Sequence, residues 1–184
     1  MLLWNQAPFL SMQLLWINLV TDSLPAIALG MEAIDPNVMD RQPKPKKEGI
    51  FDNGLGIQVV LQGVMFAILS LIGFRVGSQV TGAIEGGRTM AFLVLAFAQI
   101  LHAYNMRSHK SLFKTGLFTN KYLNLASLVS TALMCLVLFV PPIASVFGLI
   151  RLPMKLYMLG FGLAVVPVVV LEIVKAFGLV KHHK

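Results

Sequence analysis

The sequence predicts an all-α polytopic membrane protein, a bundle of five transmembrane helices. Hydrophobic residues make up 57% of the chain and charged residues only 12%, about half the charged share of a soluble domain. With so little polar surface, much of the apolar surface must face lipid, which excludes a water-soluble domain. Five apolar stretches of about 20 residues, the length that crosses a bilayer, support the same conclusion.

We expect one transmembrane domain over residues 1–184, with spans near 9–30, 55–77, 89–106, 122–140 and 155–177. The fourth stretch stops at Pro141 and Pro142. The fifth carries Gly160, Gly162 and Pro167, which bilayer helices tolerate better than soluble helices do.

The net charge of +7 does not indicate a nucleic-acid partner, because the basic residues form short clusters between apolar stretches. Segments 31–54 and 107–121 and the C-terminal tail hold eleven of the 15 Lys and Arg residues. The positive-inside rule therefore predicts that these loops and the C-terminus are cytoplasmic and that the N-terminus is outside. Segment 31–54 either contacts a soluble partner or is a solvated loop.

Asp22 is the only acidic residue well inside an apolar stretch. A charged side chain there costs at least ~2.5 to 3.5 kcal/mol and is by default a functional candidate. Asn18, Thr21 and Asp22 have the i, i+3, i+4 spacing that places side chains on one face of an α-helix.

Pro25 should interrupt this helix, because proline cannot donate to the carbonyl four residues earlier, that of Thr21. A free carbonyl would then lie beside an amide, a hydroxyl and a carboxylate. Such oxygens suit Ca²⁺ or another hard cation, and Mn²⁺ is also possible. The site is incomplete, because Ca²⁺ takes about 6 to 8 oxygens. The alternative is that these side chains only hydrogen-bond neighbouring helices.

The string LLWINLVTDSLPAIALGMEAIDPNVMDRQPK resembles the sixth transmembrane helix and following loop of P-type calcium-transporting ATPases. TMAFLVLAFAQ at 89–99 resembles the eighth helix of that family, and LEIVK at 171–175 the end of the tenth. The resemblance implies that the chain is the module of helices six to ten of such a pump, of a bacterial, plasma-membrane type in the cell membrane.

The resemblance also implies roles for individual residues. Asn18, Thr21 and Asp22 match cation ligands of the family, and Gln99 lies where two-site pumps carry an acidic ligand. An amide there implies one Ca²⁺ per cycle. Gln99 is equally well explained as a helix-packing amide.

The phosphorylation and nucleotide motifs of the family, DKTGT, TGE and GDGxND, do not occur in this sequence. ATP and Mg²⁺ are therefore expected only in the complete pump, whose preceding helices and cytoplasmic domains would be the partners of this chain. Two other functions stay open: a stand-alone channel or secondary cation transporter, and a non-catalytic structural or regulatory protein.

Three weaker patterns have structural interpretations. Glu172 and Lys175 are spaced for an ion pair at a helix end. Gly73 and Gly77 have the spacing that lets two helices approach closely. No spacing indicates a metal site at His102, which we interpret as incidental.

Overall fold

The computed structural model describes residues 7–32, 49, 55–107, 116 and 119–176, and these residues form helices and connecting turns without a strand. Five helices are long and apolar enough to cross a membrane: Ser11–Gly30, Leu55–Thr81, Ile84–Met106, Lys121–Phe139 and Met154–Lys175. The prediction of an all-α membrane protein with five spanning helices is confirmed.

The first spanning helix consists of three segments, α1 (Ser11–Trp16), a π-helical turn η1 (Ile17–Asp22) and α2 (Ser23–Gly30). The interruption expected next to Pro25 is thus a π turn that ends three residues before the proline. Two hydroxyl groups satisfy carbonyls inside it. Thr21 Oγ1 donates to the Ile17 carbonyl at 2.7 Å, and Ser23 Oγ donates to the Asn18 carbonyl at 2.9 Å.

The second and third spanning helices, α3 (Leu55–Thr81) and α4 (Ile84–Met106), form a hairpin that turns at Gly82, where φ is +70°. The expected close approach at Gly77 is confirmed, because a Cβ there would lie 2.5 Å from the carbonyl oxygen of Gly86. Helix α4, the third spanning helix, begins at Ile84, five residues before the expected start at 89. Charged residues and two glycines at 85–88 lower the hydropathy there, although both glycines are buried in the hairpin.

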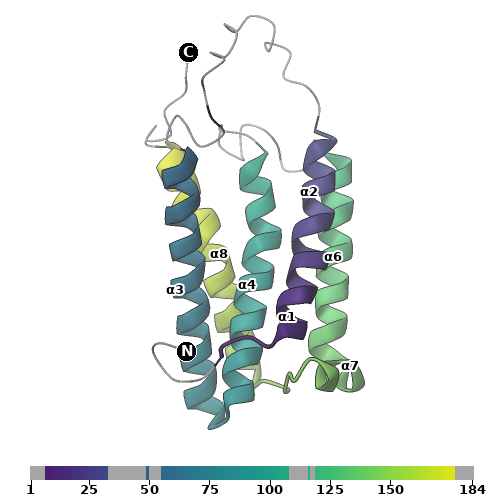
Figure 1. Ribbon diagram of the computed structural model, residues 1–184, viewed down its shortest axis with the longest axis vertical. Coiled ribbons are helices and arrows are strands. Elements are labelled where there is room, and N and C mark those ends of the chain that lie inside the picture. Colours follow the sequence, from purple (N-terminus) through teal and green to yellow (C-terminus); the bar gives the residue numbers. More distant parts are fainter. Residues whose placement is uncertain (1–6, 33–48, 50–54, 108–115, 117–118, 177–184) are drawn as a thin grey trace, which may run out of the picture.

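The remaining elements are α6 (Lys121–Phe139), the short α7 (Pro141–Val146) and α8 (Met154–Ala176). Helix α4 is the central element, and it packs against α3, α8, α6 and η1 (Figure 1). About two thirds of the most apolar 18-residue stretch of α4 is buried inside the bundle, compared with 11% of the corresponding stretch of α3. Many large apolar side chains of α3 are therefore exposed, among them Ile57, Val60 and Leu61.

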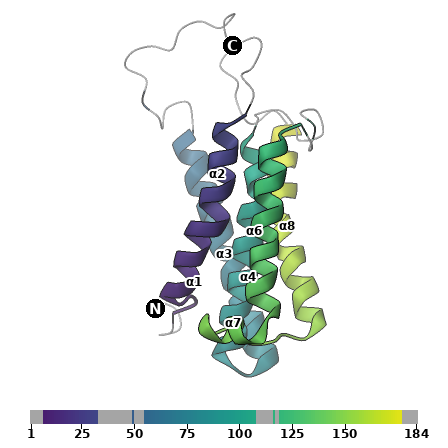
Figure 2. The same cartoon turned by 90° about the vertical axis from the view of Figure 1, so that its right-hand side faces the viewer.

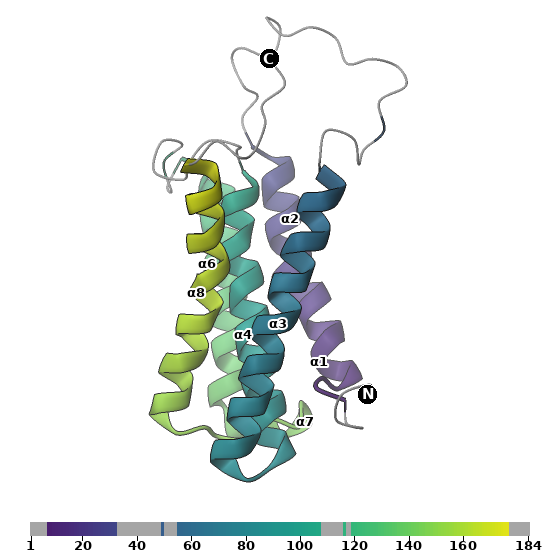
Figure 3. The same ribbon diagram turned by 90° about the vertical axis from the view of Figure 1, so that its left-hand side faces the viewer.

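The last turns of α2, α4 and α8 and the first turns of α3 and α6 lie at one end of the bundle (Figures 1 and 2). The α3–α4 turn and α7 lie at the other end (Figure 3). The segments predicted to be cytoplasmic adjoin the first of these ends. Apart from residues 31, 32, 49, 107, 116 and 119–121, both loops lie outside the described residues, as does the tail after 176.

Candidate functional site: an oxygen-lined pocket beside the π turn

The π turn opens onto a pocket of about 240 Å³ between α2, α3 and α4. Thr21 and Asp22 line it from η1, and Gln99 lines it from α4. Three of the four side chains that the sequence singled out therefore border one space, although Gln99 is 77 residues from Asp22 in the chain. The other lining residues are Pro25, Ala26, Leu29, Phe66, His102 and Ala103.

Thr21 connects the π turn with α4 at this pocket. Its side chain is buried, and Oγ1 lies 2.7 Å from the Ile17 carbonyl oxygen and 3.1 Å from Oε1 of Gln99. A hydroxyl group carries a single hydrogen, so it cannot donate fully to both oxygens at once. While Thr21 donates to Ile17, the Gln99 amide oxygen is free to accept from another donor or to contact a cation.

Asp22 is the acidic group of the pocket. Among the described residues, no side chain or backbone group donates a hydrogen bond to its carboxylate, and no cation pairs with it. A carboxylate within a spanning helix is costly when its charge is not compensated. Its place on the pocket leaves its oxygens available to a cation.

Asn18 does not line the pocket, and its side chain is exposed. The one-face prediction assumed 3.6 residues per turn, whereas a π turn has i to i+5 hydrogen bonds and holds more residues. Thr21 consequently turns inward, while Asn18 and Asp22 both lie on a more exposed side. The structure does not bring Asn18 together with Gln99.

His102 is a pocket residue that the sequence interpretation missed. It follows Gln99 by one turn of α4 and borders the pocket, and the Phe66 ring lies edge-on to it with centroids 5.1 Å apart. Its Nδ1 is buried and has no hydrogen-bond partner among the described residues. The i, i+3 spacing places His102 on the same face of α4 as Gln99, which was the available sequence signal. That signal pointed to the pocket only after the structure placed Gln99 against Thr21.

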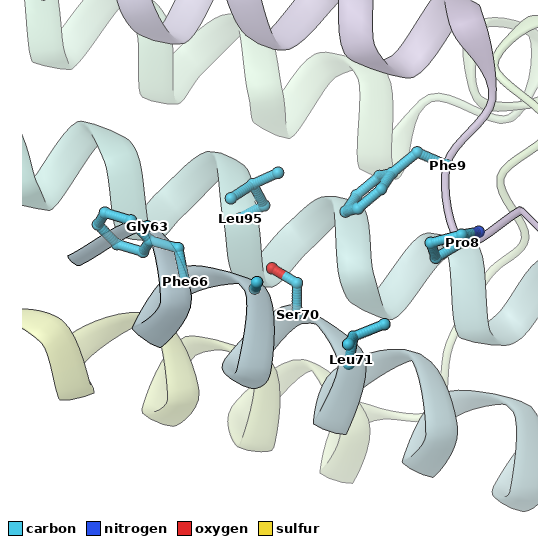
Figure 4. A pocket seen from close by; sticks show the side chains of 8 residues that line it. Pro8, Phe9, Gly63, Phe66, Ser70, Leu71 and Leu95 are labelled. Atoms are coloured by element: carbon cyan, nitrogen blue, oxygen red, sulfur yellow. The ribbon is translucent and has the colours of Figure 1, made fainter. Parts of the chain in front are cut away.

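A second pocket, of about 360 Å³, lies between α3, α4 and the segment before α1 (Figure 4). Phe9, Phe66, Leu71 and Leu95 line it, and Ser70 is the only hydroxyl-bearing residue in the lining. With so few oxygens, this pocket is unsuited to a metal ion.

The predicted contact between Glu172 and Lys175 is confirmed at 3.8 Å, and Lys175 Nζ also donates to the Asn105 carbonyl at 2.9 Å. This pair lies outside the oxygen-lined pocket and ties the last turn of α8 to α4.

The oxygens that line this pocket are of the kind that hard cations prefer. Thr21 offers one hydroxyl oxygen, Asp22 two carboxylate oxygens and Gln99 one amide oxygen. Within the part of the chain that the structure describes, no three His, Cys, Asp or Glu side chains come together as they would at a zinc site. Ca²⁺ would need further oxygens from outside these residues.

Spanning helices packed around an interrupted helix whose oxygens line a pocket are typical of polytopic membrane proteins of the transporter type. The family model described as "Cation transporting ATPase, C-terminus" matches residues 6–177, so the chain belongs to this family. The resemblance that the sequence motifs indicated is thereby confirmed.

Several curated relatives cover most of the chain. It is 36% identical to "Calcium-transporting ATPase 1" of Bacillus cereus, over 91% of this chain and 21% of that protein. It is 37% identical to "Calcium-transporting ATPase" of Bacillus subtilis, over 91% of this chain and 19% of that protein. It is also 37% identical to "Calcium-transporting ATPase 1" of Lactococcus lactis, over 96% of this chain and 20% of that protein. The chain spans about a fifth of the length of these relatives.

Proposed function

We propose that this chain is the ion-pathway membrane module of an ATP-driven P-type Ca²⁺ pump. The observation that carries the proposal is the pocket that Thr21 and Asp22 of the π turn line together with Gln99 of α4, whose Oε1 lies 3.1 Å from Thr21 Oγ1. Ca²⁺ is the transported substrate. Asp22 would supply the charge, and Thr21 and Gln99 would supply neutral oxygens.

The remaining ligands would come from helices that precede residue 7 in the complete pump. Asn18 and Asp22 are both exposed here, on the side of η1 that such helices could cover. Asn18 would then become a ligand only after the rest of the site is assembled. The amide of Gln99, in place of an acidic side chain, favours one Ca²⁺ per cycle.

The rest of the pump would supply ATP and Mg²⁺ binding and the phosphorylated residue. We assign the end of the bundle where α2, α4 and α8 finish to the cytoplasmic side of the cell membrane, because the basic segments adjoin it. The exposed apolar side chains of α3 would contact lipid or the preceding helices. Segment 31–54 would lie next to the phosphorylation domain and transmit its movements.

The test is Asp22→Asn in the complete protein, reconstituted into vesicles. We expect Ca²⁺-dependent phosphorylation by ATP and ⁴⁵Ca²⁺ uptake to be lost, because the amide keeps the shape of the side chain and removes its charge. Glu85→Gln is the matched control, since it neutralises an exposed acid in the first turn of the spanning helix α4 that does not line the pocket. Full Ca²⁺-dependent phosphorylation of the Asp22→Asn protein would refute the assignment.

A further inference from the structure

Arg107, Glu32 and Asn120 form a polar joint at the end of the bundle where α2 and α4 finish, here named the Arg107 clasp. Arg107 Nη2 donates to Glu32 Oε1 at 2.7 Å, and Nε donates to Oε2 at 3.0 Å. This two-bond fork is the strongest geometry for an arginine and a carboxylate. The Arg107 side chain is only 1% exposed and that of Glu32 28%, so water screens this pair weakly.

Further acceptors hold the Arg107 guanidinium in one orientation. Nη1 donates to the Gly116 carbonyl at 2.9 Å, and Nη2 also donates to Thr119 Oγ1 at 2.7 Å. The φ of Gly116 is +83°, which a residue with a side chain rarely adopts. Gly116 thus adopts a conformation that favours glycine, and its carbonyl accepts from Arg107.

Asn120 connects the clasp to the first turn of α6. Its Oδ1 accepts from the Leu123 amide at 2.9 Å and so caps α6. Its Nδ2 donates to the Ala28 carbonyl at 3.2 Å and to Glu32 Oε2. Ala28 lies in the last turn of α2, and its carbonyl also accepts from the Met31 amide at 3.2 Å. One side chain thus joins the end of α2 to the start of α6.

The clasp joins the two helices that carry the oxygen-lined pocket. Glu32 lies ten residues after Asp22, and Arg107 lies eight residues after Gln99. At 1.5 Å per residue, both pocket side chains are about 12 to 15 Å from the ion pair. The π turn separates α2 from α1, and the clasp lies at the opposite end of α2. Helix α2 packs chiefly on α6 and has few contacts with α4.

We propose that the Arg107 clasp is a positioning device for the cation site: it sets the separation of α2 and α4 and thereby the Ca²⁺ affinity of the pocket. This inference rests on the proposed function. Arg107 is buried and Glu32 is partly exposed, and an ion pair of this kind adds little net stability compared with apolar packing of the same volume. The two-bond fork nevertheless fixes the relative orientation of the two groups. Positioning therefore explains the clasp better than stability alone.

The first test measures Ca²⁺ activation of the complete protein with three conservative variants. Glu32→Gln removes the charge, Arg107→Lys removes the fork, and Asn120→Asp keeps a cap for α6 but places a second carboxylate beside Glu32. We expect the Ca²⁺ concentration for half-maximal ATP hydrolysis to rise about 2- to 30-fold, with the maximal rate changed by less than about twofold. The Glu32→Gln, Arg107→Lys double variant should lose no more Ca²⁺ affinity than the more impaired of the two single variants, because both substitutions disrupt the same ion pair.

Two control variants make the same chemical changes away from the clasp. Glu85→Gln alters an exposed residue in the first turn of α4, and Arg151→Lys alters an exposed residue between α7 and α8. Their half-maximal Ca²⁺ concentrations should match that of the wild type. A fall in maximal rate without a change in half-maximal Ca²⁺ in the clasp variants would overturn the proposal.

The second test measures the separation of α2 and α4 without relying on activity. Spin labels are placed at Ile27 on α2 and Met106 on α4, which are 66% and 50% exposed, in a protein with Cys135 replaced by Ala. Double electron–electron resonance should give a narrow distance distribution that broadens or shifts in each clasp variant. Unchanged distributions would overturn the proposal.

The two measurements also separate the two proposals. A wild-type protein without Ca²⁺-dependent ATP hydrolysis would refute the proposed function, and the label distances would then decide whether the clasp positions α2 against α4. A wild type activated by Ca²⁺, together with clasp variants of unchanged Ca²⁺ affinity, would refute only the clasp.

Discussion

Gly77→Ala should weaken the α3–α4 hairpin that holds the pocket helix α4. A Cβ at this position would lie 2.5 Å from the Gly86 carbonyl oxygen and 2.7 Å from the Met90 Cβ. Both neighbours belong to rigid parts of α4, so the helices must separate by about an ångström to reach ordinary contact. Overpacking of this kind costs about 1 to 3 kcal/mol.

Gly63→Ala on the same helix is the matched control, since no atom lies within 4 Å of a Cβ there. Both substitutions gain the same helix propensity, about 1 kcal/mol, so their difference isolates the steric cost. Thermal unfolding of the purified chain in detergent should place Gly77→Ala about 2 to 12 °C below Gly63→Ala. Equal unfolding temperatures, or a more stable Gly77→Ala protein, would refute the hairpin packing argued here.

Three further predictions concern the pocket and the clasp. Gln99→Glu in the complete protein adds a second carboxylate and should lower the Ca²⁺ concentration for half-maximal activation; an increase would argue that Gln99 only packs. Thr21→Val should raise that concentration about tenfold, whereas Ser23→Ala, whose hydroxyl is outside the pocket, should leave it unchanged. The Arg107 hydrogen bonds lower the pKa of Glu32 below its ordinary 4.5, against the effect of burial. The stability that ionised Glu32 adds to the folded protein is therefore complete above pH 4.5, and it is lost as the pH falls through the lowered pKa of Glu32. The difference in unfolding temperature between the wild type and Glu32→Gln should disappear in that acid range.

The sequence predicted the spanning helices well because each is long and apolar, and hydropathy over about 20 residues is the strongest signal in a membrane protein. The start of α4 was placed five residues late for a local reason. Gly86 and Gly87 look like a turn in the sequence, yet they allow the close approach of α3 that makes the hairpin. Hydropathy cannot distinguish a glycine in a turn from a glycine in a helix contact.

The candidate site was predictable only in part. Asp22 was identifiable because a lone acid in an apolar stretch is costly, and Pro25 correctly indicated an irregular helix. The side-chain directions were not predictable, since a π turn changes which residues share a face. His102 and the partners of Arg107 depend on contacts between α2, α4 and the turn before α6, which no local pattern reports.

Asp22 should destabilise the isolated chain while it serves the complete protein. No described group compensates its carboxylate, and an uncompensated charge in a spanning helix costs at least ~2.5 to 3.5 kcal/mol. Asp22→Asn, which we expect to abolish transport in the complete protein, should therefore raise the unfolding temperature of the purified 184-residue chain. Such a gain in stability with a loss of function is typical of functional sites. A lower unfolding temperature for Asp22→Asn would mean that contacts within this chain hold the carboxylate, and the pocket would then be a packing feature rather than half of a cation site.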